Sequence, residues 1–407
     1  MLTSVSDWLD EVSGNEYIWY VKRLSGNDTL ANGSHQAGPY VPKGFIFDIF
    51  PSMAGKHDDN QERWFDFYVD PHGDYRTARA VWYNNKFRGG TRNEARLTNF
   101  GGQNSPILDP ESTGALTVFA FELDSNGEAR ECHAWVARHE TEEDIIEDRI
   151  GPVDPGNWRI WSSEMPLFDT ETATEKKNPF WLTPSEIPSE WIDTFPTGAQ
   201  ITQKAVELSQ GTGLDPDNRL IKRRNCEFEL FRSIEEAIEL PHIIAGFSSM
   251  EEFIKKALSI LQRRKSRSGR SLELHAKEVF VEEGLQDGLD FSHQPISELG
   301  KKPDFLFPSA DDYHNSSFPE KQLRMLAVKT TCKDRWRQIL NEAKRIDTKH
   351  LLTLQEGISA NQFREMQEEN VQLVVPAPIV SSYADEIRPH LQTLKSFIGD
   401  VRLLKLN

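Results

Sequence analysis

The sequence predicts a two-domain protein: an N-terminal β domain, followed by an α/β domain built on a central mixed sheet. First, a chain of 407 residues is too long for one ordinary hydrophobic core. Second, short aromatic and β-branched runs dominate up to about residue 160. Third, apolar strands alternate with helical patterns after about residue 197, which is typical of an α/β core.

The first domain is expected to be a barrel or a sandwich of short strands. Its strand candidates are separated by Gly, Asn, Asp and Pro, and they are YIWYV, RWFDFYV, ARAVWY, ALTVFAFEL and HAWVA. Two helical segments, SDWLDEV and TEEDIIEDRI, flank these strands. A polar, proline-punctuated stretch follows, and we interpret it as a linker. The predicted boundaries are 1–163, 164–190 and 191–407.

The second domain is expected to begin with helices. Residues 248–265 form one predicted helix, with Ser248 and Glu251 in capping-box register. Its apolar face would carry Phe253, Ile254, Ala257, Leu258 and Leu261. Residues 271–284 form a second predicted helix that ends at Gly284. The strands DFLF, MLAVKT, HLLTL and VQLVV then alternate with the helical patterns DRWRQILNEAKR and ANQFREMQEE.

Composition narrows the class of protein. Three cysteines without C-x-x-C spacing argue against a disulfide framework or a zinc site and suit a cytoplasmic protein. No run approaches the roughly 18 apolar residues of a membrane span, so no membrane partner is expected. The net charge of −17 disfavours indiscriminate DNA binding. Residues 255–270, however, carry only basic charges, and we expect them to contact phosphates.

One constellation near the C-terminus predicts a magnesium-dependent nuclease. Asp304 heads the strand DFLF, and Lys329 follows 25 residues later at the end of MLAVK. Glu342 lies 13 residues beyond Lys329, within a predicted helix. Glu273 adds an acid on the helix that precedes the sheet. Carboxylates hold Mg²⁺, which polarises a phosphate and lowers the pKa of water, while the lysine meets the phosphate and the attacking water.

A structural explanation of the same residues stays open at this point. A single acid is most often a solvated surface charge, and Lys329 could protect an edge strand from aggregation. A lysine at the end of an apolar strand favours a functional role over a structural one, because burying its charge without partners costs free energy.

The segment Lys333-Asp334-Arg335 follows the lysine-bearing strand directly. Arg and Lys pair bidentately with guanine edges and Asp accepts from cytosine, so these three residues suit the reading of G·C pairs. The alternative is that Asp334 caps a helix and Arg335 forms a surface ion pair.

At this point the chain resembles the EcoRII family of restriction endonucleases. The resemblance extends over nearly the whole chain, and it is carried by VKRLSGNDT, SHQAGPYVP, FRGGTRNEARLTNFG, RRKSRSGRSLELH, KKPDFLFPSA and AVKTTCKDRWRQILNEA. It implies a type IIE enzyme, a homodimer that cuts CC(A/T)GG in double-stranded DNA before the first C. A second copy of the site would bind an N-terminal B3-like pseudobarrel and stimulate cleavage. The C-terminal half would have the PD-(D/E)XK nuclease fold. A cognate cytosine methyltransferase would share the site without needing to bind the enzyme.

The resemblance also implies roles for residues of the catalytic domain. Asp304 and Glu342 become metal ligands, Lys329 the catalytic lysine and Glu273 an additional acid. Tyr313 is a candidate for supporting the catalytic site. Lys333 is a candidate for catalysis and also, together with Asp334 and Arg335, for base reading. Arg223 and Arg224 would read or support the central base pair, which relatives flip out of the duplex. An ion pair between Arg224 and Glu227, three residues apart on a helix, is the alternative.

In the N-terminal domain, the DNA-binding candidates are Lys22, His35, Tyr40, Arg88, Arg92, Glu94 and Arg96. Arg92, Glu94 and Arg96 are spaced by two and would project from one face of an extended strand, as a comb that can enter a groove. Cross-strand ion pairs on a solvated face are the alternative, and His35 could equally be an ordinary satisfied polar residue.

Two other functions remain open from the residues alone. The chain could be a DNA-binding regulator that does not cleave, in which case the B3-like domain alone would carry the function. It could also be a repair or mismatch nuclease, because the same catalytic fold serves there. The intact set of Asp304, Lys329 and Glu342 favours a nuclease.

Overall fold

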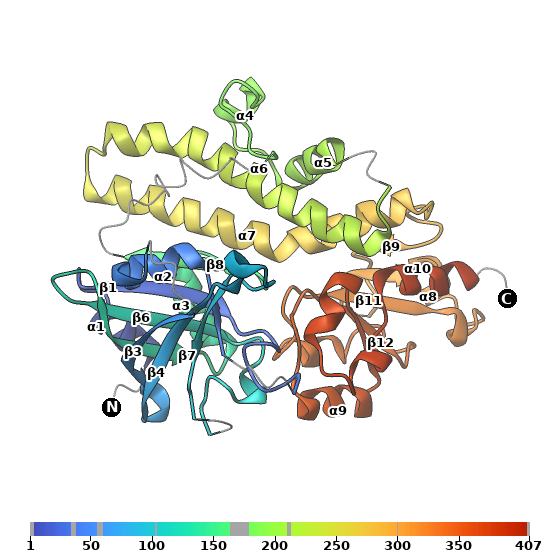
Figure 1. Cartoon of the computed structure of the whole chain (residues 1–407). Coiled ribbons are helices and arrows are strands. Elements are labelled where there is room, and N and C mark those ends of the chain that lie inside the picture. Colours follow the sequence, from blue (N-terminus) through green and yellow to red (C-terminus); the bar gives the residue numbers. More distant parts are fainter. Residues whose placement is uncertain are drawn as a thin grey trace.

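The computed structural model describes residues 4–33, 38–54, 60–101, 104–162, 179–209, 213–298 and 300–404. It contains two separate sheets, one of eight strands in the N-terminal part and one of five strands in the C-terminal part. Two long helices lie across both parts, as Figure 1 shows. The predicted combination of a β domain and an α/β domain with a mixed sheet is confirmed.

The N-terminal sheet has the strand order β2-β5-β4-β3-β7-β6-β1-β8. Its strands are β1 (Tyr17–Arg23), β2 (Tyr40–Val41), β3 (Gln61–Val69), β4 (Asp74–Tyr83), β5 (Glu94–Thr98), β6 (Leu116–Leu123), β7 (Ala129–Val136) and β8 (Trp158–Ser162). All neighbouring pairs are antiparallel except β3 and β7. Each of the five predicted strand runs coincides with one of these strands, and two of them extend one residue beyond it, at Ala115 and Ala137.

Both faces of this sheet are buried over its central strands. Along β1, Tyr20 belongs to the core that contains α2 (Lys43–Ile49), whereas Trp19 and Val21 belong to the core beneath α1 (Val5–Glu11) and α3 (Glu140–Ile150). Successive side chains of a strand point to opposite faces, so one strand supplies both cores. The two predicted flanking helices correspond to α1 and α3.

The predicted linker lies partly outside the described residues, which resume at residue 179. Residues 179–188 contain no helix or strand, and α4 (Ser189–Asp193) and α5 (Gly198–Leu208) follow. The domain boundaries proposed from the sequence therefore stay predictions.

The prediction of two helices over residues 248–284 was wrong. A single helix, α7 (Met250–Glu282), covers both, and it packs beside α6 (Pro216–Ala245). The N-cap is Ser249, whose side chain accepts from the backbone of Glu252, and not Ser248. No residue between the two predicted helices interrupts the hydrogen-bonding pattern, because neither Ser268 nor Gly269 forces a break.

The expected apolar face of this helix is largely exposed: Phe253 is 37% exposed, Ile254 48% and Leu258 53%. The seam between α6 and α7 is instead ionic. Lys256 and Arg263 both pair with Glu239, and Arg264 pairs with Glu235. The basic side chains of α7 therefore turn inward at these positions, while several apolar ones face outward.

The C-terminal sheet has the order β13-β12-β11-β10-β9. Its strands are β9 (Ser292–His293), β10 (Phe305–Phe307), β11 (Arg324–Val328), β12 (Lys349–Leu352) and β13 (Val371–Val374). The pairs from β9 to β11 are antiparallel and those from β11 to β13 are parallel. Residues of α6, α7 and α10 (Leu394–Leu403) contribute to the core on one face, and those of α8 (Ala310–His314) and α9 (Ala360–Glu368) to the core on the other.

The predicted helix between β11 and β12 is not formed as an α-helix. Only the 3₁₀ turn η7 (Trp336–Ile339) appears, and Glu342 lies beyond it. Tertiary contacts override the helical pattern here. Lys349 donates to the carbonyls of Ala343 and Ile346, and Glu298 accepts from the backbone of Lys344.

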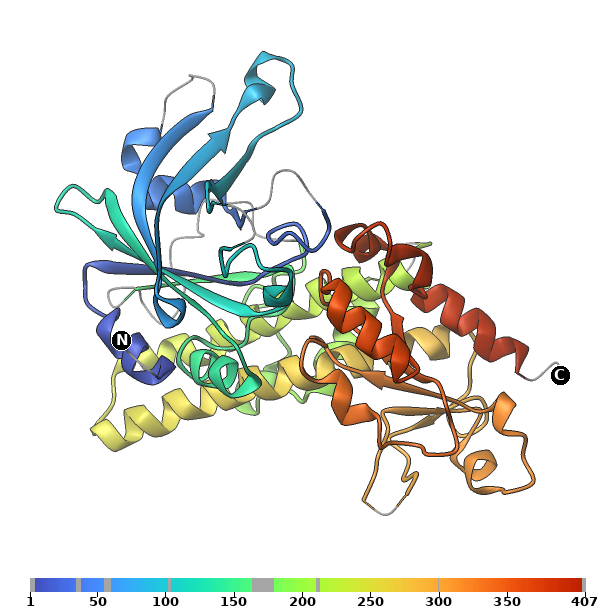
Figure 2. The same ribbon diagram turned by 90° about the horizontal axis from the view of Figure 1, so that it is seen from below.

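The two sheets are joined by more than the connecting chain. Figure 2 shows the two sheet regions beside each other, with α6 and α7 extending over both. Direct contacts also join them: the Gly26 backbone donates to the Glu356 carbonyl, 2.5 Å away. In the part of the chain that the structure describes, no helix is sufficiently long and apolar to span a membrane.

Candidate active site and DNA-facing residues

The pairing of β10 with β11 brings Asp304 and Lys329 together. Asp304 directly precedes β10, Lys329 directly follows β11, and Phe305 pairs with Leu326 in the antiparallel register. The Asp304 carboxylate accepts the backbone N–H of Val328 at 2.7 Å. Its Oδ2 atom lies 4.0 Å from the Lys329 ammonium nitrogen. Two residues distant in sequence thus share one edge of the sheet, as the sequence predicts.

Glu342 belongs to the same electrostatic environment. Burial and the charge of Asp304 raise its pKa to about 7, against the opposing effects of the lysines at 329, 301 and 349. Burial also raises the pKa of Asp304, while Lys329 and the Val328 hydrogen bond lower it. The two carboxyl groups therefore repel each other in a partly buried site.

Glu273 reaches this site from α7. It is 6% exposed, and its charge contributes to the raised pKa of Asp304. Its Oε1 atom lies 2.5 Å from the Nε2 atom of His293 and accepts from the Gln294 side-chain amide at 2.7 Å. His293 and Gln294 are not among the residues predicted from the sequence. The signal available in the sequence was their position shortly before the Pro-Asp motif; in the structure His293 lies in β9, which pairs with β10, and Gln294 directly follows β9.

The donor set fits a divalent cation. Among the described residues, no three metal-binding side chains are already gathered into a coordination group. Two neighbouring carboxylates with raised pKa values nevertheless give a cation an electrostatic reason to bind, because its charge would relieve their repulsion. Mg²⁺ is bound by one or two carboxylates and retains several waters, so Asp304 and Glu342 suffice as protein ligands.

Tyr313 lies in the core on the α8 and α9 face of the sheet. Its hydroxyl donates to Glu298, which also accepts the backbone N–H of Lys344, two residues after Glu342. Tyr313 therefore supports the turn that carries Glu342, and within the described ranges it makes no direct hydrogen bond to the other site residues.

The three predicted base readers begin the segment after β11. Asp334 is exposed, and Lys333 and Arg335 are partly buried. The Nε atom of Arg335 lies 3.0 Å from the Glu140 carboxylate, which belongs to α3 of the N-terminal domain. Gln338 also donates to Glu140, at 3.3 Å. The N-terminal domain thus holds one of the predicted DNA contacts in an ion pair.

Arg223 and Arg224 do not face solvent in this arrangement. Arg223 is 2% exposed and donates two hydrogen bonds to Glu282, at 2.8 and 2.5 Å. Arg224 pairs with Asp154 at 2.9 Å and with Glu227 at 3.4 Å, the second of which is the alternative that the sequence left open. Their role in base reading stays a prediction, and it requires both side chains to leave buried partners.

Most of the basic stretch at residues 255–270 forms ion pairs within the protein, so the expected phosphate contacts stay a prediction that would require these pairs to open. Besides the pairs with α6 described above, Arg267 is buried against Glu227 and Asp154. Lys265 pairs with Asp144 and Asp148 of α3. These charges are neutralised within the protein, so they hold α7 to α6 and to the N-terminal domain.

The N-terminal candidates have different environments. Glu94 and Arg96 lie on one face of β5, where Arg96 pairs across the sheet with Tyr40. Arg92, which precedes the strand, is 4.0 Å from Glu94, and Arg96 is 3.6 Å from it. The ion pairs that the sequence left open are therefore present, whereas Arg92 lies outside the strand, so only Glu94 and Arg96 share the strand face of the predicted comb. Tyr40 is 40% exposed.

Lys22 is the least accessible of the N-terminal candidates whose side chains the structure describes. It is 9% exposed, pairs with Asp28 at 2.6 Å, and lies near Glu356 of the C-terminal domain, whose pKa it lowers against the effect of burial. His35 lies outside the described residues. Arg88 belongs to the 3₁₀ turn Asn85–Arg88.

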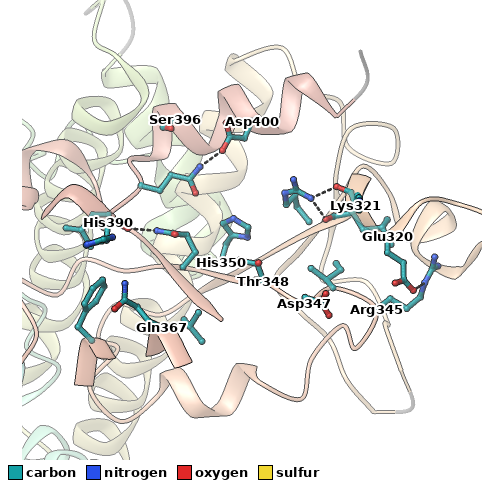
Figure 3. Close-up of a pocket in the computed structure, with 18 of the residues that line it drawn as sticks. Glu320, Lys321, Arg345, Asp347, Thr348, His350, Gln367, His390, Ser396 and Asp400 are labelled. Carbon is teal, nitrogen blue, oxygen red and sulfur yellow. Dashed lines mark hydrogen bonds and ion pairs between the residues drawn. The ribbon is translucent and has the colours of Figure 1, made fainter. Parts of the chain in front are cut away.

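A cavity of about 980 Å³ lies at the opposite edge of the C-terminal sheet. As Figure 3 shows, His350 and Thr348 border it from the sheet, and Ser396 and Asp400 border it from α10. These sheet residues lie at or just before the start of β12, whereas Lys329 follows the end of the neighbouring parallel strand. The cavity is therefore distinct from the carboxylate site.

Carboxylates and a lysine close together in a partly buried site, next to a segment with partly buried basic groups, are typical of metal-dependent nucleases. Comparison with known proteins makes this specific. The family described as "EcoRII C terminal" matches residues 231–398, and "Restriction endonuclease EcoRII, N-terminal" matches residues 13–164. The Escherichia coli protein "Type II restriction enzyme EcoRII" is 44% identical over 405 residues, which is 98% of either chain. The chain belongs to the EcoRII family of type II restriction enzymes.

Solved structures with lower similarity were also found. Metal-depleted Ecl18kI in complex with uncleaved, modified DNA matches with 21% identity and a TM-score of 0.44, over 56% of this chain and 86% of that one. The B3 domain of the UbaLAI restriction endonuclease with cognate DNA matches with 16% identity and a TM-score of 0.27, over 38% of this chain and 97% of that one.

The family assignment confirms that the chain is a type II restriction enzyme, a site-specific endonuclease, with the N-terminal and C-terminal domains of the EcoRII family. The roles of individual residues stay predictions.

Proposed function

We propose that this endonuclease cleaves double-stranded DNA at CC(A/T)GG-type sites in a Mg²⁺-dependent reaction. The observation that carries the proposal is the position of Lys329, 4.0 Å from Asp304 at one edge of the sheet, with the Glu342 carboxyl near enough for the charges of both to shift its pKa. The high identity to a type II restriction enzyme supports the reaction class. The preferred site follows from the resemblance of the base-reading segment.

In this proposal the acids at 304 and 342 hold the metal, which when bound polarises the scissile phosphate and lowers the pKa of water. Lys329 places a positive charge beside the reacting phosphate, where negative charge develops. Glu273 completes the acidic side of the site. Lys333, Asp334 and Arg335 supply base contacts, so recognition lies four to six residues from the catalytic lysine.

We propose that the active species is a homodimer that binds two copies of the site, one of them in the N-terminal domain. Cross-strand Tyr40 and Arg96, together with Arg88, Arg92 and Glu94, would contact this second copy. His35 and Lys22 are weaker members of the set. Three buried free cysteines are compatible with the cytoplasmic location that we propose.

The contact between Glu140 and Arg335 supports a restraining role for the N-terminal domain. A guanidinium paired with a protein carboxylate cannot at the same time donate fully to a guanine edge. Binding of the second DNA copy would release α3 from the recognition segment. Activation by a second site then has a physical basis in competition between Glu140 and DNA for Arg335.

The test is cleavage of unmethylated plasmids carrying two, one or no CC(A/T)GG sites, with Mg²⁺ and with EDTA. We expect cleavage at the sites, dependent on Mg²⁺ and faster with two sites than with one. Mapping the ends on a defined duplex locates the cut before the first C. Cutting at mismatches would support the repair alternative, and binding without cutting would support the regulator.

A further inference from the structure

Glu273 is held by two side chains whose role the nuclease motif does not specify. The imidazole of His293 and the amide of Gln294 both meet Glu273 Oε1, at 2.5 and 2.7 Å. The Oε2 atom accepts no hydrogen bond within the described ranges, so only one of the two carboxylate oxygens is engaged. Two donors on one oxygen fix the orientation of the carboxylate, because rotation would break both bonds.

The same two residues are tied to the backbone at Asp304. His293 pairs with Phe305 across the antiparallel strands β9 and β10, and its ring stacks on the Phe305 ring at a centroid distance of 5.2 Å. The Gln294 backbone N–H donates to the Asp304 carbonyl at 2.8 Å. The element that orients Glu273 is therefore hydrogen-bonded to the residue that carries the other acid.

The backbone of Gln294 is also held in an unfavourable conformation. Its φ of +50° lies in the left-handed region, which residues other than glycine and asparagine rarely adopt. In this conformation its N–H reaches Asp304 while its amide reaches Glu273. Strained backbone of this kind persists where the surroundings over-determine it, and it concentrates at functional sites.

We propose that His293 and Gln294 form a positioning clamp that orients Glu273 toward Asp304 and thereby sets the divalent-cation affinity of the active site. The proposal rests on the proposed Mg²⁺-dependent function. Outer residues that hydrogen-bond to metal-site carboxylates orient them in this way, and their loss typically weakens metal binding by about 10–100-fold. His293 and Gln294 are positioning residues and do not touch DNA in the proposal.

Four variants distinguish the effect of the side-chain hydrogen-bond donors from the effect of the backbone conformation at Gln294. His293→Leu removes the imidazole donor at similar volume, and His293→Gln restores a donor. Gln294→Gly removes the amide while relieving the positive φ, and Gln294→Asn keeps an amide and tolerates that φ. His242→Leu is the matched control, because His242 is an exposed histidine on α6.

The primary readout is binding of Mn²⁺ by the full-length protein, followed by the electron paramagnetic resonance of free Mn²⁺. A specific duplex with a non-hydrolysable scissile linkage is present, so that binding is measured without turnover. The second readout is the Mg²⁺ dependence of the cleavage rate. Melting temperatures show whether each variant folds.

For H293L and Q294G we expect the metal concentration at half-saturation to rise by about 10-fold or more. The cleavage rate at saturating Mg²⁺ should stay within about threefold of the parent rate. H293Q and Q294N should recover part of the affinity, and H242L should match the parent. Unchanged half-saturation in folded H293L or Q294G overturns the clamp, as does a lower melting temperature with unchanged affinity. Absence of saturable metal binding in the parent overturns the magnesium proposal as well, which distinguishes the two failures.

Discussion

The ion pair between Arg335 and Glu140 gives a quantitative test of restraint by the N-terminal domain. Glu140→Gln removes the negative charge while keeping the side-chain size. The two side chains are 29% and 39% exposed, so the pair is partly solvated and contributes about 0.2–1 kcal/mol. At about 1.4 kcal/mol per tenfold, releasing Arg335 should raise the cleavage rate on a one-site duplex by about 1.4- to 5-fold.

The assay is single-turnover cleavage of a one-site duplex with Mg²⁺, at low and at high ionic strength. Salt screens partly exposed charges, so the gain should shrink as ionic strength rises. Asp148→Asn is the matched control: it lies on the same helix and loses a contact to α7 through Lys265, at 3.4 Å, but that contact involves no predicted base reader.

An unchanged one-site rate for E140Q at low ionic strength would refute the reasoning. An equal gain in D148N would also refute it, because general loosening of the domain contact would then be the cause. A two-site substrate should show little gain, since the second DNA copy already releases the helix.

Four further predictions concern the candidate active site, the N-terminal domain and the buried ion pairs between α6 and α7. Asp304→Ala should abolish cleavage but retain specific binding; retained plasmid turnover would contradict the metal role. Arg335→Ala should lose about 1–3 kcal/mol of discrimination at one base pair, whereas uniform weakening across sequences in a binding assay would indicate a phosphate contact. Deleting residues 1 to about 165 should leave a nuclease that cuts a one-site substrate without stimulation. Glu227→Gln should destabilise the protein by about 3–5 kcal/mol at pH 7 in urea titrations, because it leaves two buried arginines, Arg224 and Arg267, to share Asp154 as their acidic partner. Burial opposes the ionisation of Glu227, but Arg267, His275 and Arg224 outweigh it and hold its pKa well below the ordinary 4.5. The loss of unfolding free energy relative to the parent should therefore be complete above pH 4.5, and it should shrink as the pH falls below this value.

The local sequence pattern was sufficient to predict the structure where the chain forms short strands. Alternating burial in runs such as RWFDFYV, and the position of Asp304 before one apolar strand and of Lys329 after the next, depend only on side-chain periodicity and strand ends. The antiparallel pairing of those two strands then brings the acid and the lysine together.

Predictions from the local sequence pattern were wrong where long-range contacts determine the backbone conformation. The segment around Glu342 has helical periodicity, but hydrogen bonds from Lys349 and to Glu298 hold it in turns. The basic stretch of α7 looked like a DNA-binding surface, yet a stripe of acids on α6 at Glu227, Glu235 and Glu239 neutralises much of it. Their spacing of eight and four residues places them on one helical face, and this was a signal available in the sequence.

The sequence alone determined the combination of a β part and an α/β part, which follows from side-chain periodicity, and the family, which follows from the resemblance. It also predicts the three residues of the nuclease motif from their positions around strand ends. Only the tertiary structure decided which charges are available to DNA. Arg223, Arg224 and Arg335 carry the same charge in the sequence as any free arginine, but their partners Glu282, Asp154 and Glu140 come from distant segments. The strength of a charge interaction depends on distance and burial, and both are set by the packing of the α6–α7 pair and the N-terminal domain.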